Sequence, residues 1–166
     1  GEAGVNEFMK FTILAVGKLK TAYLRDGVAE FVKRLTVYGG VTITELNESK
    51  LPSADDSKRQ AIVAEEGERL LKQVNPKSYV VLLDVKGKTM SSEALAEKIA
   101  DLEVQGISEM TFIIGGAFGV SEALRIRADF RLSFSPMTFT HQMVRLLLVE
   151  QIYRACKINR HEPYHW

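Results

Sequence analysis

Cysteine is almost missing from this sequence, because Cys156 is the single example among 166 residues. One cysteine cannot close an internal disulfide, so the composition gives no sign of secretion and fits the reducing cytoplasm. Cys156 ends a predicted helix that is apolar in nearly every direction. This favours a small buried side chain over a reactive nucleophile.

Long apolar runs are missing as well. No stretch approaches the ~20 residues that a membrane-spanning helix requires. The first eight residues, GEAGVNEF, lack the apolar segment of a secretory signal, and Met9 follows them. We therefore expect Met9 to be the natural start, residues 1–8 to be a remnant outside the fold, and residues 9–166 to form one cytoplasmic domain that does not contact a membrane.

An excess of either charge is also missing, since 22 Lys and Arg residues face 21 Asp and Glu residues, for a net charge of +1. This balance alone predicts no nucleic-acid partner. The distribution is uneven, however, because residues 141–166 contain all three histidines and four basic residues but only two acidic ones. Such a patch can bind phosphates, and a solvated basic tail fits the same pattern.

Short apolar runs alternate with segments of helical periodicity along the whole chain. The runs predict strands at residues 10–16, 41–46, 78–85, 110–116 and 130–135, with a turn at residues 86–88. The periodic segments predict helices at residues 21–35, 58–74, 91–105, 121–127 and 141–156. The expected fold is α/β, a mostly parallel sheet flanked by helices on both faces. The polar loop at residues 46–57 could be a lid or a disordered excursion.

Several loops that follow the predicted strands are rich in glycine or in small residues, at residues 17–20, 83–87, 115–119 and 134–140. Ligands of such sheets bind at the carboxyl ends of the strands. Neither the dinucleotide fingerprint nor the phosphate loop occurs. A glycine at a strand end usually makes only a turn, but together the loops favour a nucleotide-like ligand.

The last predicted helix, HQMVRLLLVEQIYRAC, is apolar in nearly every direction. A helix of this kind must be covered on all sides. One side can pack on the sheet, and the simplest cover for the other is the same helix of a second subunit. A central helix in a monomer is the alternative.

Five blocks in this order resemble one known family: VGKLK, LLDVKGKTMSSE, FIIGGAFG, LSFSPMTFTHQMVRLLLVEQIYRA and HEPYH. Together they resemble the ribosomal large-subunit pseudouridine methyltransferase H family of the SPOUT, or α/β-knot, superfamily, from Met9 to His165. The resemblance implies a C-terminal trefoil knot, a homodimer, and S-adenosylmethionine as methyl donor without a metal. It also implies methylation of nitrogen 3 of a pseudouridine in helix 69 of 23S ribosomal RNA, on assembled ribosomes. The donor contacts that it implies are Leu83, Gly115, Phe134, Ser135, Pro136, Met137, Thr138 and Phe139.

The resemblance also suggests which residues handle the base. We expect Arg154, Tyr164 and His165 to bind it and take part in the chemistry, with His141 as a supporting group. His141 could instead be an ordinary helix-start residue, Arg154 could merely pair with Glu150, and the tail could be frayed. Trp166 departs from the basic residue that the family pattern leads us to expect after the Tyr-His pair.

We expect Lys18, Lys20, Arg145 and Arg160 to contact RNA phosphates. The sequence is equally compatible with these lysines being ordinary solvated surface residues. Two other functions stay open at this point. A non-catalytic RNA-binding dimer would need a broken donor site. A general nucleotide-binding enzyme would need a phosphate loop or an acidic ribose partner after a glycine-rich turn; Asp84 is the only plausible ribose partner, and the residues after it do not form that motif.

Overall fold

Five parallel strands form the centre of the computed structural model, which describes residues 8–50 and 55–164. The strands lie in the order β2-β1-β4-β3-β5, and all their pairings are parallel. Their bounds are β1 Lys10–Val16, β2 Val41–Leu46, β3 Tyr79–Lys88, β4 Glu109–Ile114 and β5 Phe130–Leu132. The predicted α/β class with a parallel sheet is therefore confirmed.

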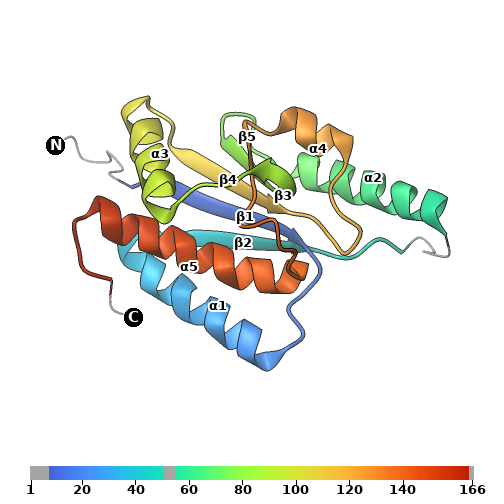
Figure 1. The fold of residues 1–166 in the computed structure, drawn as a ribbon, viewed down its shortest axis with the longest axis horizontal. Helices are drawn as coiled ribbons and strands as arrows, with labels where there is room; N and C mark the ends of the chain where they lie inside the picture. The colour runs from blue at the N-terminus through green and yellow to red at the C-terminus, as the bar shows by residue number, and fades with distance from the viewer. Residues whose placement is uncertain (1–7, 51–54, 165–166) are drawn as a thin grey trace.

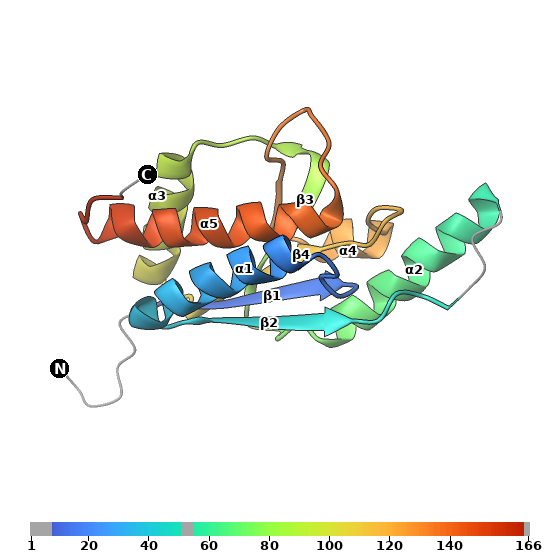
Figure 2. The same cartoon turned by 90° about the horizontal axis from the view of Figure 1, so that it is seen from below.

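Helices cover both faces of this sheet (Figures 1 and 2). Helices α1, α3 and α5 share one hydrophobic core, and α2 and α4 pack on the other face. Their bounds are α1 Ala22–Leu35, α2 Asp56–Lys72, α3 Ser92–Val104, α4 Glu122–Arg127 and α5 His141–Asn159, with a 3₁₀ turn η1 at Thr36–Tyr38. The strands and helices that alternate along the sequence therefore form three layers, with the sheet in the middle and helices on each face.

Strand β1 shows why the buried strands are continuous apolar runs. Phe11 and Ile13 face the core of α1, α3 and α5, whereas Leu14 and Val16 face the core of α2 and α4. Successive side chains of a strand point to opposite faces, so a strand covered on both faces is apolar at most positions rather than at every second one.

Helix α5 lies against both α1 and α3. Its contact with α1 is close, since a Cβ atom on Gly27 would lie 2.9 Å from Cδ1 of Leu146. The glycine therefore lets the two backbones approach, and the inner face of the helix is fully buried at Leu148, Val149, Ile152 and Ala155.

Three element ends differ from the sequence prediction by three residues, and the other ends differ by two or fewer. Strand β3 extends to Lys88, whose carbonyl accepts a hydrogen bond from Ser133 N at 2.9 Å, but its register with β5 shifts between Leu83 and Lys88, so the chain leaves the regular ladder close to the turn predicted at residues 86–88. Strand β5 ends at Leu132, since the Ser133 hydroxyl donates to Ser135 O at 3.0 Å and turns the chain. Helix α5 runs one turn longer than predicted, to Asn159.

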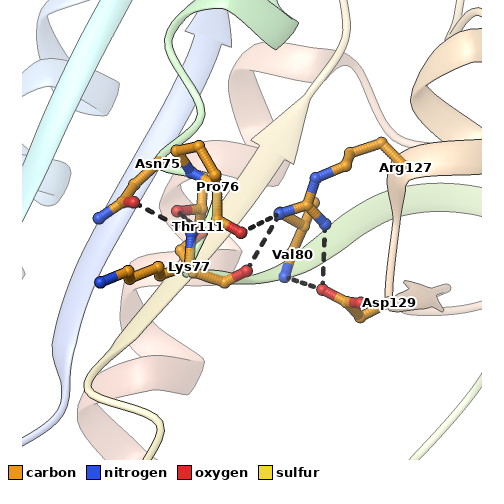
Figure 3. A network of polar contacts seen from close by, with 8 residues as sticks. Asn75, Pro76, Lys77, Val80, Thr111, Arg127 and Asp129 are labelled. Atoms are coloured by element: carbon orange, nitrogen blue, oxygen red, sulfur yellow. Dashed lines mark hydrogen bonds and ion pairs between the residues drawn. The ribbon is translucent and has the colours of Figure 1, made fainter.

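A polar network anchors the start of β3 to the end of α4 (Figure 3). The Asp129 carboxylate accepts hydrogen bonds from Val80 N at 2.8 Å and from Arg127 Nη1 at 3.2 Å. Arg127 Nη2 also donates to Ser78 O at 3.2 Å. This network is at the amino end of β3, so it fixes α4 from the side opposite to the carboxyl ends of the strands.

Candidate functional site

A cavity of about 640 Å³ opens at the carboxyl ends of β3, β4 and β5 and at the start of α5. Most of the residues predicted to bind a donor line it, namely Leu83, Gly115, Phe134, Ser135, Met137, Thr138 and Phe139. Pro136 is exposed and does not line this cavity. Segments that lie far apart in the sequence therefore meet around one space, which is large enough for a nucleoside-sized ligand.

The loop after β4 requires its glycines. A Cβ atom on Gly115 would lie 2.7 Å from the carbonyl oxygen of Gly119 and 2.9 Å from Val120. Gly119 has a φ of +104°, which favours glycine, and its N–H donates to Gly116 O at 3.2 Å. The result is a tight turn whose backbone can approach a ligand closely.

The segment between β5 and α5 forms another wall and is held by its own side chains. The Ser135 hydroxyl accepts a hydrogen bond from Met137 N at 3.0 Å. Thr140 caps α5 by accepting from Met143 N at 3.2 Å. Met137 is 75% exposed and Phe139 is 43% exposed, so the mouth of the cavity carries unusually accessible apolar side chains.

Asp84 lies in the cavity wall but is already occupied. Its Oδ2 atom accepts from Arg125 Nε at 3.2 Å and lies 3.6 Å from Arg131, and its Oδ1 accepts from Lys86 N at 3.0 Å. Both oxygens therefore have partners within the chain. This arrangement gives Asp84 a structural role, because it ties β3 to α4 and β5.

His141, the first residue of α5, borders the same cavity. Burial lowers the pKa of its imidazole below the usual value, and the positive charge of Arg145 adds to this, whereas Glu48 opposes it. Its Nε2 and the Glu48 carboxylate both lie within 4 Å of the place where a Gly17 Cβ would be. The ring is therefore neutral at pH 7 and able to accept a proton.

Arg145 corrects a sequence prediction. Its side chain is only 1% exposed, and its guanidinium pairs with Glu45 and donates to Gly17 O at 2.9 Å. A buried and paired guanidinium cannot meet an RNA phosphate on the surface. The role that the structure gives Arg145 is to join α5 to the ends of β1 and β2.

Arg154 and Tyr164 lie near the far end of α5. Arg154 pairs with Glu150 at 2.7 Å, and its guanidinium lies 3.9 Å from the centre of the Tyr164 ring. Burial, followed by a hydrogen bond with Glu150, raises the pKa of Tyr164 to about 12, so its phenol is neutral at physiological pH. Neither residue lines the cavity. Thirteen residues separate Arg154 from His141, which is roughly 20 Å along a helix.

The remaining predicted residues are spread over the surface. Lys18 and Lys20 are exposed in the loop after β1, beside the amino end of α5. Arg160 follows the carboxyl end of α5, with its guanidinium 4.2 Å from the Phe8 ring. His165 lies outside the described residues, as does Trp166. Within one chain the basic residues therefore do not form one patch.

Sequence reasoning missed several cavity residues, among them Arg125, Val120 and Val144. Their spacing carries no distinctive signal, because each is an ordinary helix or loop residue until the chain folds. Cys156 packs against the core, and burial raises the pKa of its thiol to about 12. This agrees with a structural rather than nucleophilic cysteine.

Metal-binding clusters and membrane-spanning helices are both absent from residues 8–50 and 55–164. No group of three or more His, Cys, Asp or Glu side chains there is arranged to hold a metal ion. No helix among those residues is both long and apolar enough to cross a bilayer.

Comparisons with known proteins agree with one another. A family model described as "Predicted SPOUT methyltransferase" matches residues 9–165. The ribosomal RNA large subunit methyltransferase H of Halothermothrix orenii is 52% identical over 158 residues, covering 95% of this chain and 99% of that protein. The protein of the same name from Carboxydothermus hydrogenoformans is 48% identical over the same shares.

A solved structure shows the same fold at low sequence identity. The crystal structure of tRNA (m1G37) methyltransferase from Aquifex aeolicus superposes with a TM-score of 0.53 at 15% identity. The match covers 96% of this chain and 75% of that one.

Proposed function

The chain belongs to the SPOUT methyltransferase family, among the ribosomal RNA large subunit methyltransferases H, and on that premise we propose its reaction. It transfers a methyl group from S-adenosylmethionine to nitrogen 3 of a pseudouridine in helix 69 of 23S ribosomal RNA. The observation that carries the donor assignment is the cavity at the carboxyl ends of β3, β4 and β5. The residues implied as donor contacts by the family resemblance, apart from Pro136, surround this one space.

The walls of the cavity suit this donor. Adenine needs a flat apolar slot and a few backbone hydrogen bonds. Leu83, Phe134 and Phe139 supply apolar surface, and the glycine turn at residues 115–119 exposes backbone groups. When bound, S-adenosylmethionine would supply a methyl group on a positively charged sulfonium, whose sulfur departs as a neutral thioether and so needs no metal to activate it.

The protein then has to position the base and manage its proton. N3–H of pseudouridine is a weak acid, so it must be lost at or before attack. His141 is neutral at pH 7 and borders the cavity, which suits a proton acceptor or a supporting group. A cation such as Arg154 would stabilise the negative charge that develops on the base.

Arg154 and Tyr164 can serve the cavity only if a second subunit brings them there. A strip of α5 that includes Leu147 and Gln151 borders a second cavity of about 390 Å³, which shares Phe134 and Phe139 with the donor cavity. A two-fold axis across this strip would place the far end of one α5 beside the near end of the other. We therefore propose a homodimer in which each donor cavity works with Arg154 and Tyr164 of the partner subunit.

The RNA partner is proposed to be the assembled ribosome in the cytoplasm. Lys18 and Lys20 lie at one end of α5 and Arg160 at the other, so one chain offers only small, separate basic sites. Two subunits on a pre-shaped RNA surface can use these sites together, as contacts that position without reading sequence.

The proposal is tested with labelled S-adenosylmethionine. Assembled ribosomes that lack the modification, and a naked RNA hairpin of the same sequence, are incubated with the protein, and the methylated nucleoside is mapped by mass spectrometry. We expect one methyl on the pseudouridine base of the ribosome and little on the hairpin. Efficient methylation of the hairpin would contradict the need for a ribosomal surface. Donor and ribosome binding without transfer would favour the non-catalytic RNA-binding dimer.

A further inference from the structure

A buried carboxylate lies directly behind the glycine turn. Glu66 of α2 is only 5% exposed and does not line the donor cavity. A Cβ atom on Gly116 would lie 2.7 Å from Glu66 Oε1 and 3.2 Å from Val16 Cγ1. The carboxylate therefore fills the space into which any larger residue at position 116 would extend.

The other oxygen of Glu66 holds a different segment. Its Oε2 accepts a hydrogen bond from Ser49 N at 2.9 Å. The next residue toward β2 is Glu48, whose carboxylate faces Gly17 and influences the pKa of His141. One side chain thus contacts both the turn that borders the donor and the segment that approaches His141.

Burial of Glu66 has an energetic cost, because a carboxylate leaves water without a cation of its own. Burial raises its pKa, and the charges of Glu65 and Glu48 act in the same direction, whereas Ser49 N–H and Arg69 lower it. Arg69 donates its hydrogen bonds to Glu65 and to Asn47 O instead. An apolar side chain at position 66 would avoid this cost. What the carboxylate provides, and an apolar side chain would not, is the hydrogen bond to Ser49 N together with the contact behind Gly116.

The next residue of α2 holds the other end of the same loop. A Cβ atom on Gly67 would lie 2.3 Å from Ser121 Oγ, so α2 and α4 touch here. Ser121 caps α4 by accepting a hydrogen bond from Leu124 N at 3.2 Å. Glu66 and Gly67 therefore contact both ends of the loop at residues 116–121 from behind.

We propose that Glu66 is a positioning residue for methyl transfer. It braces Gly116 so that the glycine turn keeps the shape that the donor needs, and it ties the segment at residues 47–49 to that turn. It acts through Gly116 and does not touch the donor. The inference rests on the proposed function, because it takes the cavity as the donor site.

Reciprocal substitutions test this brace. Glu66→Ala leaves a gap behind Gly116, and Gly116→Ala pushes a methyl group into the Glu66 carboxylate. In the double variant the new methyl group occupies the vacated space. Calorimetric titration with S-adenosylmethionine should therefore show about tenfold weaker binding for each single variant and a recovery toward the wild-type affinity in the double variant.

Two controls accompany the titrations. Glu68→Ala, on an exposed position of the same helix, should bind as the wild type does. Glu66→Gln keeps the shape and an acceptor for Ser49 N–H, so its affinity should stay within about twofold of the wild-type value. Thermal midpoints, recorded for every variant, separate unfolding from loss of binding.

The outcomes are distinct. Losses that simply add in the double variant, or an unchanged affinity in Glu66→Ala, would overturn the role of Glu66. If the wild type itself bound no S-adenosylmethionine, the proposed function would fail first and the role of Glu66 with it.

Discussion

Arg145 donates a 2.9 Å hydrogen bond to the carbonyl oxygen of Gly17, and this contact fastens the first turns of α5 to the end of β1. The same guanidinium pairs with Glu45 in β2. Because α5 begins at the cavity with His141, this buried cation fixes the position of a residue that borders the proposed donor site. The helix start is therefore placed by an ion pair as well as by the apolar core.

Arg145→Met should lower the free energy of unfolding by about 3 kcal/mol, because it leaves Gly17 O without its donor and Glu45 without its cation. Arg154→Met on the same helix is the matched control. It breaks a partly exposed pair with Glu150 and should cost less than about 1 kcal/mol. Urea denaturation measures both values. Equal losses of unfolding free energy in the two variants would show that the buried ion pair stabilises the fold no more than the partly exposed pair does.

Gly115→Ala should impair donor binding more than it impairs folding. The added methyl group meets the carbonyl oxygen of Gly119, a backbone atom that cannot move without opening the turn. We expect S-adenosylmethionine to bind at least about tenfold more weakly. Gly106→Ala is the control, since it strains a φ of +88° in a turn away from the cavity. It should cost stability while leaving the affinity unchanged, and a similar affinity loss in both variants would contradict a specific role for the turn.

His141 should make the stability of the protein depend on pH. Burial lowers its folded-state pKa below the ordinary value of 6.5, so the unfolded chain takes up a proton before the folded one does. The contribution of the neutral ring is therefore complete above pH 6.5 and is lost as the pH falls through the folded pKa. Wild type should lose stability relative to His141→Gln over this interval. Denaturation curves at several pH values measure the difference, and a constant difference would mean that the folded pKa is not lowered.

Two inactive variants should restore activity when they are mixed as dimers. Gly115→Ala impairs the donor cavity, and Arg154→Ala removes the cation proposed to come from the partner subunit. A mixed dimer contains one site with both defects and one site with neither. Random mixing should therefore recover about a quarter of the wild-type activity. The measurement is methyl transfer to ribosomes after unfolding and refolding the mixture. No recovery would mean that Arg154 serves the cavity of its own chain.

The strands were predictable because their sequence pattern is local. The run from Phe11 to Val16 is apolar on both faces except at Thr12, and the sheet buries both faces, so periodicity and structure agree. The residues of the donor cavity came from the family resemblance rather than from periodicity. The glycine after β4 suggested a close backbone approach, but no local pattern says that Leu83 and Phe134 will meet it.

Charged residues whose partners are distant in sequence could not be placed in advance. Arg145 follows His141 by one helical turn and looks like a surface cation, yet its partners are 100 and 128 residues away. Glu66 is one of several glutamates in the helix predicted at residues 58–74, and its burial depends on contacts with Ser49 and Gly116. The trefoil knot is implied by the family resemblance alone and stays a prediction. Periodicity could not have indicated it, because it carries no information about how the chain threads.

The central claim is that the cavity at the carboxyl ends of β3, β4 and β5 holds the methyl donor. A crystal structure of the protein grown with saturating S-adenosylmethionine tests it most directly. We expect density for the donor between Leu83, the glycine turn at residues 115–119 and the segment at residues 134–139. Density for the donor at another place, or an empty cavity at saturation, would contradict it.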